Sequence, residues 1–92
     1  MTPNDHFDPL APQREAAFFY GLFLRGHSLD ALRQDIDISP KVREKWKKAR
    51  DFQAEFRADL ERIYTFRKQV LAVFEALVQS EIINARQRSR VQ

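Results

Sequence analysis

The alternation of apolar and polar positions along the chain predicts an all-α protein. The first apolar run lies in "REAAFFYGLFLRG", residues 14–26, and predicts a helix over about residues 12–25. Pro12 suits the first turn of that helix, and Gly26 suits its end. Because apolar residues nearly encircle this helix, we expect it to be buried on more than one side.

A second, short helix is predicted over about residues 28–36. Leu29, Leu32 and Ile36 fall on one helical face, and Ser28 precedes them as a capping hydroxyl. Ser39-Pro40 then marks the start of a third helix, since serine caps the open amides and proline fits the first helical position. On this third helix, Val42, Trp46 and Ala49 share a narrow apolar face, which should turn inward.

No glycine or proline interrupts the chain after Pro40, so no local signal ends the third helix at Arg50. A helix from residue 40 to about 87 would be roughly 70 Å long at 1.5 Å per residue. Two outcomes are open: a continuous rod that pairs with another chain as a coiled coil, or a break near Tyr64–Arg67 that produces a helical hairpin. Both predict a homodimer. The residues expected to mediate dimerisation are Phe56, Ile63, Val70, Phe74 and Leu77.

The aromatic residues are expected to form the core, because they recur at helical spacing. The set consists of Phe18, Phe19, Phe23, Phe52 and Phe56, with Trp46. The chain has no cysteine, which excludes disulfides and thiolate metal sites. The longest apolar run is too short to cross a bilayer and lacks the features of a signal peptide, so we expect a soluble cytoplasmic protein with no membrane partner.

Charge is distributed unevenly along the chain. The formal net charge is +3, but residues 40–50 carry six basic side chains and one acidic one. Such a cluster on a nearly balanced protein indicates a local anion-binding surface.

The stretch "SLDALRQDIDISPKVREKW", residues 28–46, resembles the trihelical helix-turn-helix domains of transposases and of bacterial and phage regulators. Those domains have a pattern of the type S-L-x-x-L-A-x-x-x-G-I-S-P-x-x-V-x-x-W, preceded by a helix that ends in glycine. The resemblance covers about residues 14–50. It departs at Arg33, where the family has a small residue, at Asp37, which replaces the turn glycine, and at Val42, which is one position early.

The resemblance implies that residues 40–50 form a recognition helix that binds the major groove of double-stranded DNA. Lys41, Glu44 and Lys47 or Lys48 would meet base edges, and Arg43, Lys45 and Arg50 would hold phosphates. Ser39 and the amides beside it would also contact a phosphate. The complete set of candidate DNA-binding residues is Ser39, Lys41, Arg43, Glu44, Lys45, Lys47, Lys48 and Arg50.

No catalytic pattern is present in the sequence. The two histidines lack partners at metal-ligand spacing, and no phosphate loop or nucleophile motif occurs. Asp51, Glu55 and Asp59 follow at spacings of four, and we expect them to pair with Arg57, with Arg62 or with a partner helix rather than with a metal. We therefore predict no enzyme activity, no metal or cofactor and no small-molecule substrate.

These observations predict a flexible N-terminal arm at residues 1–11 and a helix-turn-helix unit at 12–50. A helical dimerisation region at 51–87 and a basic tail at 88–92 follow. The expected function is sequence-specific or architectural DNA binding as a homodimer, in the manner of a small transcriptional regulator. Two alternatives stay open: a helical protein–protein interaction module, and the DNA-binding subunit of a larger phage or transposon assembly.

Overall fold

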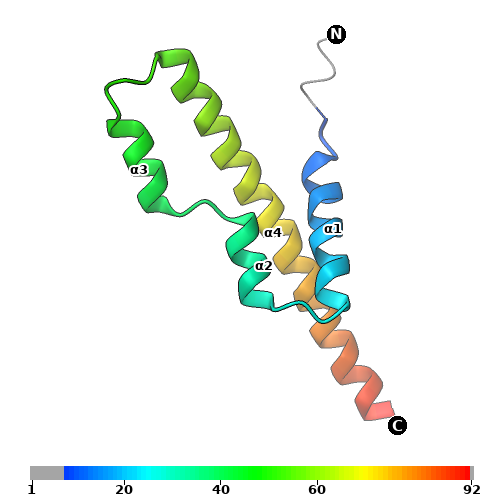
Figure 1. Cartoon of the computed structure of the whole chain (residues 1–92). Helices are drawn as coiled ribbons and strands as arrows, with labels where there is room; N and C mark the ends of the chain where they lie inside the picture. Colours follow the sequence, from blue (N-terminus) through cyan, green and yellow to red (C-terminus); the bar gives the residue numbers. More distant parts are fainter. Residues whose placement is uncertain (1–7, 92) are drawn as a thin grey trace.

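The computed structural model describes residues 8–91, and all the regular secondary structure in that range is helical. The elements are α1 (Ala11–Leu24), α2 (Leu29–Ile36), α3 (Pro40–Lys48) and α4 (Ala54–Val91) (Figure 1). The prediction of an all-α protein is confirmed. Most of the expected N-terminal arm, residues 1–7, lies outside the described residues, and so does residue 92.

Gly26 ends α1 in the way that the sequence predicts. Its φ is +100°, a left-handed conformation that only glycine adopts without strain. The Gly26 N–H donates to the Phe23 carbonyl at 3.0 Å, and the His27 N–H donates to the Leu22 carbonyl at 3.1 Å. This pair of bonds is the Schellman motif, which satisfies the last open carbonyls of a helix.

The two glycines provide a matched pair of alanine substitutions with opposite effects. Gly26→Ala is expected to lower the free energy of unfolding by about 1–2 kcal/mol, because a Cβ is strained at positive φ. Gly21→Ala is expected to raise it by about 0.5–1 kcal/mol, because Gly21 lies inside α1 with nothing within 4 Å of an added Cβ. Urea unfolding followed by circular dichroism measures both changes, and a shift in the same direction for both variants would contradict this assignment.

Serine side chains begin α2 and α3, as predicted. The Ser28 hydroxyl accepts a hydrogen bond from the Ala31 N–H, and the Ser39 hydroxyl accepts one from the Val42 N–H, each at 3.3 Å. Both serines have extended backbone angles, which is the geometry of an N-cap. The residues between α2 and α3, 37–39, are non-helical, so the two helices are separate elements.

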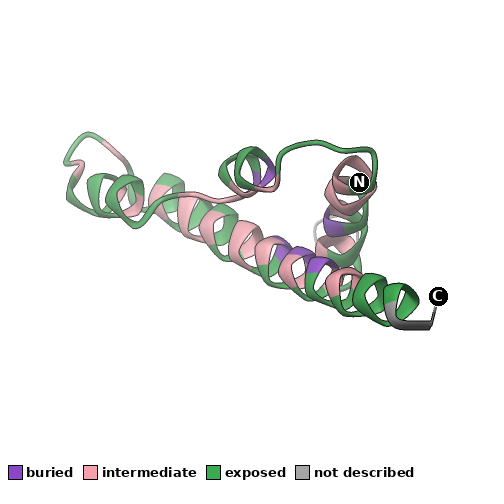
Figure 2. Ribbon diagram, turned by 90° about the horizontal axis from the view of Figure 1, so that it is seen from below, coloured by how far each residue is buried: buried purple, intermediate pink, exposed green. Residues whose placement is uncertain are grey.

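The buried core lies between α1, α2 and the central part of α4 (Figure 2). Its members are Ala16, Leu32, Ile36, Val70, Phe74 and Val78. Val70 and Phe74, expected at a dimer interface, are fully covered within this chain, and Leu77 packs beside them. The expectation that all the aromatics face inward is wrong for Phe18 and Phe56, which are 61% and 48% exposed.

The connection between α3 and α4 differs from both outcomes expected from the sequence. Helix α3 ends at Lys48, residues 49–53 form an irregular turn, and α4 then runs unbroken past Thr65. The low helix propensity of threonine costs only about 0.7 kcal/mol or less relative to alanine, and this does not interrupt α4. By turning back near residue 50, the chain lays α3 against α4 instead of extending it into solvent.

Helices α2 and α3 lie one after the other along α4, and α1 packs on the same central part of α4 as α2 does (Figure 1). Among the described residues, α3 comes close to α4 but not to α1 or α2. The helix-turn-helix unit expected at residues 12–50 would need α3 to pack on α2, and this packing is not found. The resulting molecule is elongated, with extents of 60 × 33 × 17 Å. No helix within residues 8–91 has the length and apolarity needed to span a membrane.

Candidate nucleic-acid interface

Arg43 holds the inner face of α3 against α4. Its guanidinium donates to both carboxylate oxygens of Glu61, with Nη2–Oε2 at 3.0 Å and Nε–Oε1 at 3.1 Å. These hydrogen bonds raise the pKa of Arg43 above its ordinary value. The guanidinium also lies over the ring of Tyr64, with 4.7 Å between Cζ and the ring centroid. Arg43, expected at a phosphate, is thus engaged within the chain.

A row of ion pairs continues along α4 from this contact. Three α4 side chains spaced seven residues apart take part, so they lie on one face of the helix. The pairs are Glu61 with Arg43 of α3, Lys68 with Asp37 of the α2–α3 connection, and Glu75 with Arg33 of α2. This row attaches the whole segment from α2 to α3 to a single face of α4.

The ion pairs shift the pKa values of Lys68 and Glu75 in the directions that favour their charged forms. The hydrogen bond to Asp37 raises the pKa of Lys68, and the hydrogen bonds from Arg33 lower the pKa of Glu75. Lys68 also lies 5.1 Å from the centroid of the Tyr64 ring, on which Arg43 lies as well. Tyr64 therefore links the Arg43 and Lys68 contacts into one polar network.

The turn after α3 is held by Arg57. Its guanidinium donates a hydrogen bond to the carbonyl of Ala49, the residue directly after α3. Trp46 is half-buried beside Arg57 and Glu61, in a small hollow between α3 and α4. The predicted inward orientation of Trp46 is thus found, although Val42, on the same apolar face, is 37% exposed.

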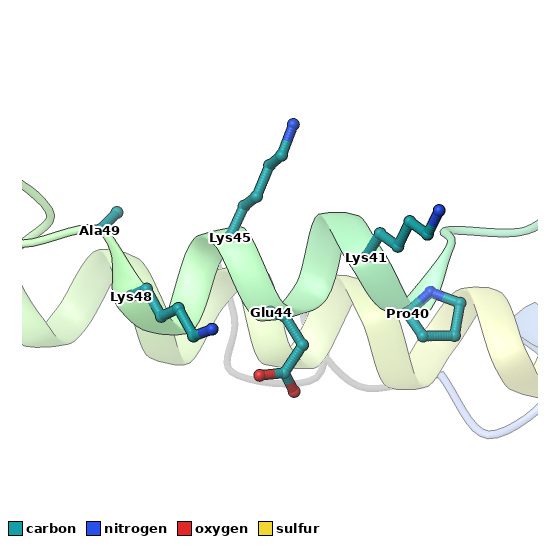
Figure 3. Close-up of a pocket in the computed structure, with 6 residues that line it drawn as sticks. All are labelled: Pro40, Lys41, Glu44, Lys45, Lys48 and Ala49. Carbon is teal, nitrogen blue, oxygen red and sulfur yellow. The ribbon is translucent and has the colours of Figure 1, made fainter.

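The opposite side of α3 carries an exposed surface that we call the lysine face, formed by Lys41, Lys45 and Lys48 (Figure 3). Spacings of four and three residues place these side chains on one side of a helix. None of the three forms a salt bridge with any carboxylate in the described part of the chain. Together with Pro40, Glu44 and Ala49 they line a shallow, open hollow.

Repulsion among the three lysines of the lysine face is only partly offset by Glu44, which lines the same hollow. Like charges at i,i+3 and i,i+4 destabilise a helix by about 0.2–0.5 kcal/mol per pair. Lys45 and Lys48 lie in the last turn of α3, where the helix dipole favours positive charge and offsets part of that cost. A bound polyanion would remove the remaining repulsion, so the face has the electrostatics of an anion-binding surface.

The other candidate residues have varied surroundings. Ser39 is exposed but its hydroxyl is occupied by the cap of α3. Glu44 and Lys47 are both exposed, and the distance between Glu44 Oε1 and Lys47 Nζ is 3.9 Å, at the limit of a salt bridge. Arg50 is exposed in the turn after α3. The structure therefore places all the candidates except Arg43 at the surface of α3 or at its ends.

The acidic residues that follow α3 do not form a metal site. Within residues 8–91, no three histidine or carboxylate groups are placed so that they could hold a metal ion together. Asp59 pairs with Arg62 on the same helix, as the sequence indicates, whereas Arg57 is directed to the Ala49 carbonyl instead.

Glu61 and Tyr64 are the site residues that the sequence reasoning did not identify. The signal for Glu61 is the seven-residue spacing of Glu61, Lys68 and Glu75, a charged row parallel to the apolar one. Comparisons of the chain with protein-family models, with curated proteins and with solved structures gave no match.

Proposed function

We propose that this protein binds double-stranded DNA through the lysine face of α3, as a small regulatory or architectural protein that acts as a homodimer. The observation that carries the proposal is the set of three exposed lysines, none in a salt bridge among the described residues, on one side of a helix whose other side is attached to α4. The resemblance of residues 28–46 to helix-turn-helix sequences points to the same helix, although α3 packs on α4 and not on α2.

The shape of α3 suits a duplex. An α-helix with its side chains is about 10–12 Å across, and the major groove of B-DNA is about 12 Å wide. Because α3 touches only α4 among the described residues, its outer side is free to enter a groove or to lie along a strand. Lysine binds phosphates as a point charge without a fixed geometry, so the contacts would be dominated by the DNA backbone.

The internal engagement of Arg43 changes the number of phosphates expected at the interface. Lys41, Lys45 and Lys48 supply three contacts, and Lys47 and Arg50 raise the number to five at most. Glu44 at the edge of the face would repel a phosphate and favour a base amino group, such as that of cytosine. Binding would therefore consist mainly of non-specific attraction between these basic side chains and DNA phosphates, with one candidate base contact at Glu44.

A helical protein–protein interaction module is the second candidate function. The exposed apolar residues at the start of α4, Phe56 and Ile63, favour it, because exposed apolar patches mark interaction sites. The two functions are compatible if the partner at that surface is a second copy of the chain, and two copies would present two lysine faces to one duplex.

The salt dependence of DNA affinity tests the proposal. With three to five phosphates neutralised, log K should fall against log [salt] with a slope of about −3 to −4.5 per protomer, at about 0.9 per phosphate. The measurement is fluorescence anisotropy of a labelled duplex between about 50 and 200 mM salt. Absence of binding at the lowest salt, or an affinity independent of salt, would refute the proposal.

A further inference from the structure

Helix α4 passes through two different environments. All the buried residues of the described chain lie in α1, in α2 or in the part of α4 from residue 70 to residue 78. The other half of the molecule consists of α3 and residues 54–66 of α4, and none of its residues is buried (Figure 2). Helices in proteins are stabilised mainly by burial of an apolar face. This half therefore lacks the cover that residues 70–78 of α4 receive.

A partly exposed row of apolar side chains runs along this half. We call it the apolar stripe; it consists of the exposed Phe56 and Ile63, the half-buried Leu60 between them and the half-buried Phe52 in the turn just before α4. Phe56 is 48% exposed and Ile63 is 46% exposed, and the rings of Phe52 and Phe56 meet edge to face at 4.9 Å. Phe56, Ile63 and the buried Val70 are spaced seven residues apart and so share one face. That face is covered at Val70, where α1 and α2 pack on α4, and it is exposed at Phe56 and Ile63.

We propose that the apolar stripe pairs with the same stripe of a second copy of this chain, with the two α4 helices antiparallel and Phe56 of each copy opposite Ile63 of the other. The inference rests on the part of the proposed function that invokes two copies and is independent of DNA binding. It assigns the interface to the start of α4, whereas Val70 and Phe74 belong to the core of each protomer.

Charges beside the apolar stripe are self-complementary in this register. Glu55, Asp59 and Arg62 are exposed along the same flank of α4. In antiparallel pairing, equivalent flanks of the two helices meet. With Phe56 opposite Ile63, Arg62 of one copy lies level with residue 57 of the other copy. At 1.5 Å per residue, it is then about 3 Å along the helix axis from Glu55 and from Asp59 of that other copy. Arg62, which pairs with Asp59 of its own helix in the single chain, would thus also face Glu55 and Asp59 of the second copy, twice in the symmetric pair.

The position of α1 favours the antiparallel arrangement over the parallel one. Packing between α1 and α4 covers the shared face at Val70 and Phe74. Parallel helices in register would place both α1 helices at the same level along the pair, where each covers the face of α4 that would have to meet the partner helix. Antiparallel pairing about the midpoint between residues 56 and 63 overlaps only residues 54–65 of each helix. The α1 helices then lie at the two outer ends.

The mass of the full chain in solution, measured without DNA by sedimentation equilibrium, tests the pairing. The wild-type chain is expected to have twice the protomer mass of 10.9 kDa at about 200 µM, since small interfaces give micromolar dissociation constants. The double variant Phe56→Glu with Ile63→Glu is expected to be a monomer. The control is Phe18→Glu, at an apolar residue of α1 that is 61% exposed, and it should remain a dimer.

Charge reversal and cross-linking test the register. Glu55→Arg with Asp59→Arg should dissociate the dimer, and the further change Arg62→Glu should restore it. Because the chain has no cysteine, engineered thiols are unambiguous. A mixture of Phe56→Cys and Ile63→Cys chains should form disulfide-linked pairs of one variant with the other, and neither variant should link to itself.

The outcomes separate this inference from the proposed function. A monomer at every concentration, a dimer that persists in the Phe56→Glu, Ile63→Glu variant, or self-linked Phe56→Cys chains would each overturn the antiparallel pairing. Normal circular dichroism of the variants would show that they are folded, as expected for substitutions at exposed positions. A dimer that responds as expected but ignores DNA would support the pairing and refute DNA binding.

Discussion

Replacing Phe74 with alanine is expected to remove about 3–5 kcal/mol from the free energy of unfolding. The Phe74 side chain is fully buried, and it packs with Val70 and Val78 of α4 against residues of α1 and α2. The substitution loses the burial of an aromatic ring and leaves a cavity at the point where three helices meet. A domain of 92 residues has a total stability of roughly 5–14 kcal/mol at about 0.05–0.15 kcal/mol per residue. The variant would therefore be close to unfolding.

The same substitution at Phe18 serves as the control. Phe18 is 61% exposed on α1, so Phe18→Ala is expected to cost less than about 1 kcal/mol. Urea unfolding should be compared at one protein concentration, because self-association would add to the apparent stability. Equal losses for the two variants would show that Phe74 is not the centre of the core.

The starts of α2 and α3 and the end of α1 were predictable because they depend on local chemistry. A serine hydroxyl reaches an amide three residues on, as Ser28 and Ser39 do, and a glycine adopts positive φ, as Gly26 does. Each of these features involves atoms within a few residues of one another. A single sequence therefore contains all the information they need.

The turn between α3 and α4 was not predictable for the opposite reason. Residues 49–53 contain no glycine or proline, so local propensity favours a continuous helix. The contacts that accompany the turn join distant positions: Arg43 with Glu61, and Arg57 with the Ala49 carbonyl. The sequence indicated the apolar and basic faces of α3, but it did not indicate that Arg43 would pair with Glu61 of α4.

The seven-residue apolar repeat illustrates a further limit. Phe56, Ile63, Val70 and Leu77 are equivalent by spacing, yet Phe56 and Ile63 are exposed whereas Val70 is buried. Periodicity identifies a face of a helix but not which part of the face is covered. Helix α1 has 14 residues, about 21 Å at 1.5 Å per residue, and so can cover only part of the much longer α4.

The triple variant Lys41→Gln, Lys45→Gln, Lys48→Gln is expected to weaken DNA binding on the order of 10²–10³-fold at about 0.1 M salt. Each phosphate contact contributes about 0.9 to the exponent of the salt dependence, so three lost contacts remove about 2.7 from the slope. Fluorescence anisotropy with a labelled duplex measures both the affinity and the slope. The substitutions retain helix propensity and lie at exposed positions, so circular dichroism should be unchanged.

A control variant with the same change of net charge distinguishes binding through the lysine face from a general attraction of a positively charged protein to DNA. Arg14, Arg25 and Arg86 are exposed and lie outside α3, on α1, just after it and near the end of α4. Their triple replacement with glutamine is expected to weaken binding far less, because screening at about 0.1 M salt limits the reach of a charge to about 10 Å. If both triple variants lost affinity equally, net positive charge alone would account for the binding. The lysine face would then have no special role, since its contribution depends on direct contact between α3 and the phosphates.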